Sequence, residues 1–229
     1  MRTTIEFDPS FTMLTAELTP GESLKAEPGA MAAQQGLDMR TGMGGGGGLF
    51  GGFKRMLGGE SFFLNTFTAG PGGGWISLAP PTPGDIISHD LMPGQNLYIQ
   101  GSSFLACTEN VSTDAKFQGM KGMFSGEKIF FLRAYTEGGQ GTVHVNSYGA
   151  IKKLNIQPGS ELVVDTGHVV AFTDNVQYSV GKVGGLGSLI AGGEGLVLKF
   201  TGSGDVWIQT RTLSSLMDKL APFLPSTKS

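Results

Sequence analysis

The chain has 229 residues, of which 38 are glycine and only 15% are charged, and its formal net charge is −3 at pH 7. This length suffices for a sizeable hydrophobic core, whereas a weakly acidic chain is not built to neutralise a nucleic-acid backbone over its whole surface. The single cysteine, Cys107, excludes an intramolecular disulfide bond.

The N-terminal segment, residues 1–8, contains acidic residues and lacks the apolar stretch of a secretory signal peptide. No apolar run in the sequence reaches the roughly 18 residues of a membrane-spanning helix. A lone thiol also fits a reducing compartment. Together these features predict a cytoplasmic protein.

A short phrase with the pattern apolar-x-Pro-Gly-x-x-Leu occurs three times, starting at Leu18, Leu91 and Ile156. Proline fixes φ at the first central position of a turn, and glycine accepts the positive φ of the second. Each phrase therefore predicts a type II turn, and the leucine that follows it begins a strand that points into the core.

A second phrase repeats in step with the first, because the Gly-Glu pairs that end at Glu60, Glu127 and Glu194 lie 67 residues apart each time. Each pair leads into an apolar strand and then into a strand with alternating apolar residues. Two interpretations of the three carboxylates are open. They form one equivalent set around the pseudo-threefold axis, or each carboxylate accepts hydrogen bonds from backbone N–H groups at the turn where its strand begins. We favour the structural role, because spacing alone cannot bring the three together.

These repeats divide the chain into segments 1–84, 85–149 and 150–212, with no Ser- or Pro-rich linker between them. The pattern predicts one compact all-β domain over 1–229, built from three pseudo-symmetric β-units around a pseudo-threefold axis. A short helix over 213–221 is predicted next, with Thr212 or Ser214 as its N-cap. Its apolar residues recur at helical spacing on one face: Leu213, Leu216, Met217 and Leu220.

The connector before each Gly-Glu pair places large apolar residues among glycines, with cations nearby. Three roles are open: each connector caps its own β-unit as a short helix, forms a subunit interface, or binds a protein partner or a membrane surface. The candidate interaction surface consists of Phe50, Phe53, Lys54, Arg55, Leu57, Met123, Phe124, Leu189 and Ile190.

Catalytic and cofactor motifs are not recognisable in the sequence. The glycine run over 42–48 lacks the Gly-Lys-Ser/Thr triplet of a phosphate-binding loop, so we interpret it as a connector. His89, His144 and His168 show no metal-ligand spacing, and His144 is expected to face solvent or a neighbouring subunit. Cys107 lies in an apolar strand and is expected to be a buried, inert thiol. We therefore predict no enzyme activity, no cofactor and no metal site.

Several longer segments carry a family resemblance. The segments over 51–64, 83–87, 146–151, 164–172 and 207–211 together resemble the prokaryotic branch of the "altered inheritance of mitochondria, twenty-four" family. The resemblance implies a fold like that of the tryptophan RNA-binding attenuation protein, a short double-stranded β-helix, in three copies. It also implies self-association. The mitochondrial members of the family are linked to inner-membrane organisation. This chain is expected to lack a transit peptide, so that role does not transfer to it directly.

These observations predict a non-catalytic oligomeric scaffold or binding module that acts through an assembled surface. The expected partner is the chain itself, with a trimer as one candidate, followed by another protein or a membrane surface. One alternative is a small-molecule-binding or enzymatic β-helix protein with a site between units. The other is an RNA-binding ring, which the dispersed basic residues do not favour.

Overall fold

The computed structural model describes residues 1–43, 63–116, 131–182 and 196–225. Almost all regular structure in this part of the chain is β, with one α-helix near its end, so the predicted all-β class is confirmed. None of the helices described there has the length and apolar character needed to cross a bilayer.

The strands follow one another along the whole chain, with the helix last. The first seven are β1 (Arg2–Glu6), β2 (Met13–Leu18), β3 (Ser23–Ala26), β4 (Met31–Gln35), β5 (Leu37–Met43), β6 (Phe63–Ala69) and β7 (Gly74–Leu78). The next six are β8 (Ile86–Leu91), β9 (Asn96–Gln100), β10 (Phe104–Thr108), β11 (Val111–Lys116), β12 (Phe131–Thr136) and β13 (Gly141–Asn146). The last elements are β14 (Ile151–Ile156), β15 (Leu162–Asp165), β16 (Val169–Thr173), β17 (Val176–Lys182), β18 (Leu196–Gly202), β19 (Gly204–Gln209) and α2 (Leu213–Leu220).

One pattern of antiparallel pairing occurs three times. The strands of one kind of triplet lie in the orders β2-β7-β4, β8-β13-β10 and β14-β19-β16, and those of the other kind in the orders β5-β6-β3, β11-β12-β9 and β17-β18-β15. The irregularities of strand register also match. In β4, β10 and β16 the register shifts between the first and the third residue, directly after Met31, Phe104 and Val169. Because the shift recurs at the same position of three equivalent strands, it is a β-bulge that belongs to the fold and bends each strand there.

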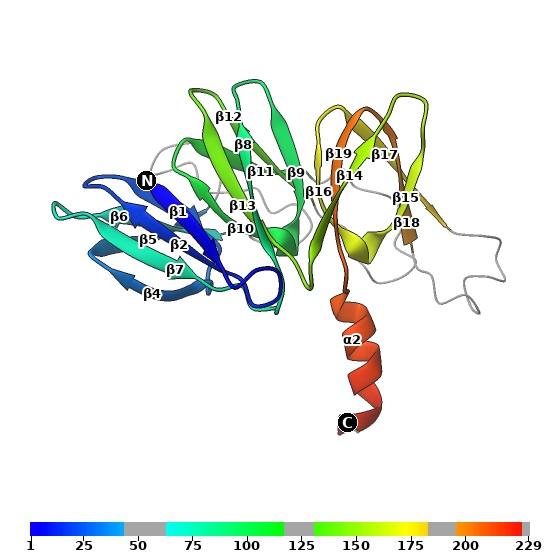
Figure 1. Ribbon diagram of the computed structural model, residues 1–229, viewed down its shortest axis with the longest axis horizontal. Coiled ribbons are helices and arrows are strands. Elements are labelled where there is room, and N and C mark those ends of the chain that lie inside the picture. The colour runs from blue at the N-terminus through cyan, green and yellow to red at the C-terminus, as the bar shows by residue number, and fades with distance from the viewer. Residues whose placement is uncertain (44–62, 117–130, 183–195, 226–229) are drawn as a thin grey trace.

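Strand pairs between successive triplets join them into larger sheets. β3 pairs with β10 and β9 pairs with β16, so two six-stranded sheets each combine strands from neighbouring sequence repeats. Figure 1 shows the three strand groups side by side, with α2 projecting away from them. Backbone hydrogen bonds across repeats therefore hold the groups together, in addition to side-chain packing.

The three Pro-Gly turns are confirmed. Gly21, Gly94 and Gly159 have φ of 80°, 87° and 83°, as the second central residue of a type II turn requires. In each turn the backbone N–H of the following residue donates to the carbonyl three residues earlier, at 3.0 Å. Of the leucines that follow, Leu24 and Leu97 are fully buried.

His144 on β13 corrects one prediction, because its side chain is completely buried instead of facing solvent or another subunit. Its Nδ1 atom lies 2.8 Å from the hydroxyl of Ser88 on β8, and burial lowers its pKa to about 4. Ser77 and Trp207 occupy the corresponding places of β7 and β19 and are also buried. The alternation of apolar and polar residues along these strands therefore does not mark a solvent-exposed face, because side chains on both faces are buried at these positions.

The segments that lead from one repeat to the next form a row of backbone contacts. The Thr12 N–H donates to the Gly84 carbonyl at 3.1 Å, and the Asp85 N–H donates to Gly149 at 3.0 Å. The Arg211 N–H then donates to the Tyr148 carbonyl at 3.2 Å. We call this row of segments, residues 12, 83–85, 147–150 and 210–211, the crossover row.

We predict that Gly84→Ala lowers the free energy of unfolding by at least about 2 kcal/mol, within the range of severe single substitutions. A Cβ atom at Gly84 would lie 1.9 Å from the carbonyl oxygen of Ser147, so the crossover row would have to separate. Urea denaturation followed by circular dichroism measures the change.

Gly138→Ala is the matched control, because a Cβ atom there meets no atom within 4 Å. Its effect on the unfolding free energy should stay within about 0.5 kcal/mol. Equal effects of both substitutions would contradict the importance of the close approach at Gly84.

Candidate assembly surface

Strand β4 has an edge that its two counterparts do not have. Every residue of β4 is exposed, from Met31 to Gln35. The counterpart strands β10 and β16 are buried over their first four residues, and each pairs on its second side with a strand of the preceding repeat. Among the described residues, β4 pairs with β7 alone, so its outer backbone N–H and C=O groups face outward without a strand partner.

Strand β15 has the complementary free edge. Its counterparts β3 and β9 each pair with two strands, whereas β15 pairs with β18 alone within the part of the chain described. The side chain of Val163, in the middle of β15, is 47% exposed. The pairs β3–β10 and β9–β16 are thus two copies of one junction between repeats. The free edges of β15 and β4 correspond to the two sides of that junction.

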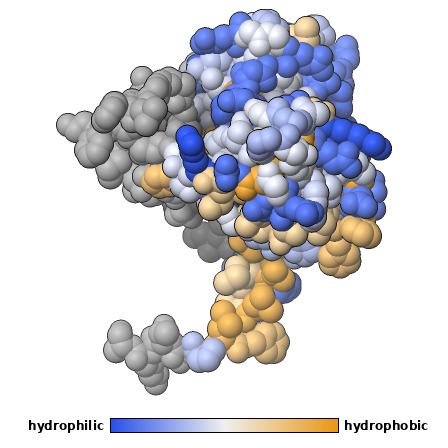
Figure 2. All heavy atoms as spheres, turned by 90° about the vertical axis from the view of Figure 1, so that its left-hand side faces the viewer, coloured by the Kyte–Doolittle hydropathy of each residue, from blue (hydrophilic) through white to orange (hydrophobic). Residues whose placement is uncertain are grey.

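Helix α2 presents a second unpartnered surface. Thr212 caps it as predicted, because its hydroxyl oxygen accepts from the Ser215 N–H at 3.2 Å. None of the helix residues is buried, although apolar residues line one face as predicted. Figure 2 shows this apolar helix standing away from the more polar body of β-strands. An exposed apolar surface of this kind indicates a contact with another molecule.

The predicted interaction surface and the three repeated glutamates lie outside the described residues, so both stay predictions. The surface residues concerned are Phe50, Phe53, Lys54, Arg55, Leu57, Met123, Phe124, Leu189 and Ile190, and the glutamates are Glu60, Glu127 and Glu194. The strands on either side of the three connectors belong to the described residues. Each connector joins the ends of one strand pair, β5–β6, β11–β12 or β17–β18, at equivalent positions of the pairing pattern.

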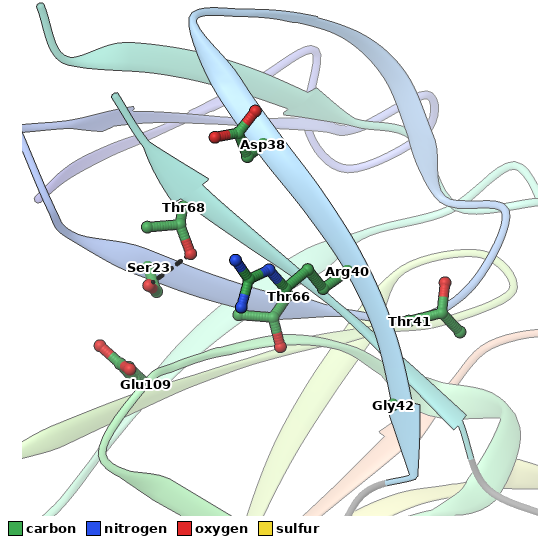
Figure 3. A pocket seen from close by; sticks show the side chains of 8 residues that line it. All are labelled: Ser23, Asp38, Arg40, Thr41, Gly42, Thr66, Thr68 and Glu109. Carbon is green, nitrogen blue, oxygen red and sulfur yellow. Dashed lines mark hydrogen bonds between the residues drawn. The ribbon is translucent and has the colours of Figure 1, made fainter. Parts of the chain in front are cut away.

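A polar groove of about 410 Å³ lies on the outer face of β3, β5 and β6. It also involves Glu109, from the turn between β10 and β11, so residues of the first and second repeats meet there. Figure 3 shows the Arg40 side chain extending across Thr66, and the Ser23 hydroxyl lies 2.9 Å from that of Thr68. The lining offers hydroxyl groups and charges of both signs, which suits a small polar ligand rather than nucleophilic catalysis.

His89 and His144 lie on the paired strands β8 and β13, one residue out of register, so their side chains point to opposite faces of the sheet. The ring of His89 packs edge-on against Trp207 at 5.2 Å, and burial lowers the pKa of His89. The Nδ1 atom of His168 lies 2.7 Å from the carbonyl oxygen of Gln209. Within the described ranges, no three His, Cys, Asp or Glu side chains group closely enough to hold a metal ion.

Cys107 on β10 is fully buried, and burial raises the pKa of its thiol to about 12. The thiolate is the nucleophilic form of cysteine, so this residue is inert at neutral pH. The interpretation of Cys107 as a core residue is therefore confirmed.

Glu27 is a group that the sequence analysis missed. It lies in the turn between β3 and β4, where its backbone N–H donates to the Leu105 carbonyl at 2.8 Å. Its Oε2 atom is buried without a hydrogen-bond partner, and burial raises the pKa of the carboxyl group to about 7. The segment Glu27-Pro28-Gly29 resembles an ordinary turn, and burial of one carboxylate leaves no signal in such a segment.

We predict that Glu27→Gln stabilises the protein at pH 8 but not at pH 4. Because burial raises the pKa of Glu27 in the folded state from its ordinary value of 4.5 to about 7, stability is greatest below pH 4.5 and falls as pH rises through 7. The partly exposed carboxyl group is screened by solvent, so the difference between the two pH values should be about 1–2 kcal/mol.

Urea denaturation across this pH range measures the difference. Glu17→Gln is the control, because Glu17 is an exposed glutamate on β2 and should give no pH-dependent gain. A constant difference between Glu27→Gln and the parent protein from pH 4 to pH 8 would disprove the burial of a charge at Glu27.

Comparisons with known proteins match nearly the whole chain. The model of the family described as Mitochondrial biogenesis AIM24 matches residues 3–211. An uncharacterized protein from Streptococcus pyogenes serotype M6 is 31% identical over 235 residues, which cover 99% of this chain and 92% of that protein. The crystal structure of a Streptococcus pyogenes protein, 29% identical, covers 97% of this chain and 99% of its own, with a TM-score of 0.79. The chain therefore belongs to the Mitochondrial biogenesis AIM24 family, in agreement with the resemblance seen in its sequence.

Proposed function

We propose that the protein is a non-catalytic scaffold assembled from copies of itself, in which β15 of one copy pairs with β4 of the next. The observation that carries this proposal is the exposure of all of β4, at the place where β10 and β16 are buried by a strand of the preceding repeat. A second copy would supply the strand that β4 lacks.

The two internal junctions give the register of the proposed pair. Thr108 lies opposite Leu24 and Thr173 lies opposite Leu97, and the residue before each threonine faces the residue after the leucine. The register of β4 on β7 makes Gln35 the counterpart of the two threonines, and Leu162 is the counterpart of the two leucines. The same pattern therefore places Gln35 opposite Leu162 in the proposed pair. It then places Gln34 opposite Val163, whose exposed side chain would be covered.

This contact is heterologous, because two different edges meet. A heterologous contact closes into a ring when its rotation permits, and otherwise extends as a filament. We propose a closed ring, with the trimer as the first candidate. The predicted three pseudo-symmetric units of the short double-stranded β-helix type are part of this proposal, with nine units completing a trimeric ring. A pseudo-threefold axis within one chain would instead close the three units on themselves and pair β4 with β15 of the same copy, whereas both strands end their sheets.

Such a ring would display the three connectors of every copy at equivalent positions. The connectors join corresponding ends of β5–β6, β11–β12 and β17–β18, and they contain the predicted apolar and basic residues. We propose that this repeated surface binds a protein partner or a membrane surface in the cytoplasm. The repetition would raise affinity through multivalent contact.

The polar groove supports a second candidate function, the binding of a small polar molecule between repeats. Arg40 and Glu109 provide opposite charges in the groove that the hydroxyl groups of Ser23, Thr66 and Thr68 also line. RNA binding has less support, because several basic side chains of the described residues are engaged within the fold. Lys25 donates to the carbonyls of Glu109 and Val111, and Arg133 pairs with Asp114.

We predict that Gln34→Glu combined with Val163→Glu converts the assembly into monomers. The two carboxylates would lie directly opposite each other in the proposed strand pair, where like charges destabilise pairing. Light scattering coupled to size-exclusion chromatography measures the mass, and circular dichroism verifies that the β-structure is retained.

Gln34→Lys combined with Val163→Glu is the matched control, because it changes the same two positions but places opposite charges across the pair. This variant should assemble like the parent protein. A parent protein that remains monomeric at all accessible concentrations would disprove the scaffold proposal, as would identical behaviour of the two double variants.

A further inference from the structure

The apolar face of α2 is an exposed surface without a partner among the described residues. Each of its apolar side chains is exposed, and the exposed fraction rises to 84% at Phe223 in the turn that follows the helix. We infer that α2 docks on the loop between β1 and β2 of a second copy, the copy whose β4 pairs with β15 of the first. This inference rests on the proposed function.

The loop between β1 and β2 carries two highly exposed aromatic side chains. Phe7 is 67% exposed and Phe11 is 76% exposed. The Phe11 N–H donates to the Phe7 carbonyl at 3.3 Å, so a hydrogen bond closes the loop between the two aromatic residues. Phe7 has a φ of 63°, a conformation that is uncommon for a bulky residue and is frequently found at functional surfaces.

The crossover row predicts that these two surfaces meet in the assembly. The row runs from Thr12 through Gly84 and Gly149 to Arg211, so its two ends adjoin the β1–β2 loop and the start of α2. Figure 1 shows this loop and the start of α2 at the same lower side of the strand groups. If β15 pairs with β4 of the next copy, the row of one copy ends where the row of the next begins. The segment after Arg211 then lies beside Phe11 of that copy.

Charge supports a protein contact rather than a lipid surface. Inside α2 the charges of Asp218 and Lys219 cancel, whereas helices that bind anionic bilayers are rich in basic residues. The β1–β2 side carries Glu6 and Asp8, and the α2 side carries Arg211. Among the described residues none of these three forms an ion pair within the chain, so they are available to pair across the contact.

Cross-linking between two differently substituted proteins tests the contact. One protein carries Met217→Cys on the apolar face of α2, and the other carries Phe11→Cys. Cys107 is buried and inert, so it gives no competing reaction. After mixing and mild oxidation, we expect covalent dimers that contain one chain of each kind.

The matched control replaces Met217→Cys by Ser215→Cys, which lies on the opposite face of the same helix, and its cross-linking yield should be at least about fivefold lower. Separately, replacing Leu216, Met217 and Leu220 together by serine should weaken self-association roughly tenfold or more, because apolar contacts are lost. Replacing Ser215 by alanine, on the opposite face, should leave self-association unchanged.

The outcomes separate this inference from the proposed function. An oligomeric parent protein whose Met217→Cys and Phe11→Cys chains fail to cross-link would overturn the docking of α2 and leave the scaffold proposal standing. A monomeric parent protein would overturn both. Loss of binding to phosphatidylcholine–phosphatidylserine vesicles in the triple-serine variant, with assembly unchanged, would identify the bilayer as the occupant and overturn docking on a second copy.

Discussion

The strand pairing between repeats is the constraint on which the rest of the structure depends. A strand pair satisfies backbone N–H and C=O groups, which cannot be buried without partners. β3 with β10 and β9 with β16 provide this pairing inside the chain, and they bury the second and third copies of a strand that stays exposed in the first. One kind of contact therefore accounts for the continuity of the sheets and for the location of their free edges.

The same constraint explains why the molecule has little conventional site chemistry in its described part. Both faces of β13 and β19 are covered, so groups such as His144 are used inside the fold and titrate far from neutral pH. Cys107 is buried in the same way. Polar character remains at the surface, in the groove beside Arg40 and Glu109, and apolar character remains at α2 and the β1–β2 loop. This distribution supports the proposed role of a scaffold that contacts other molecules.

Local chemistry made part of the fold predictable. The Pro-Gly turns and the Thr212 cap follow from the conformations of a few adjacent residues, so the sequence was sufficient for both. The pairing of β3 with β10 joins residues far apart in sequence, and no local pattern encodes it. The exposure of β4 was missed, although Gln34 and Gln35 stand where the later repeats have Cys107–Thr108 and Phe172–Thr173. A comparison of the aligned repeats could have revealed that polar substitution.

Strand β4 also has a consequence for the newly made chain. Natural edge strands are protected from unwanted pairing by lysine, proline or inward-pointing charges. β4 contains only methionine, alanine and glutamine, so its protection is limited to its short length and the register shift after Met31. A copy without neighbours thus exposes a segment able to pair with any extended peptide. In the proposed assembly, a chain that meets sister chains soon after synthesis would be incorporated, whereas a chain that stays alone for longer would be more exposed to aggregation.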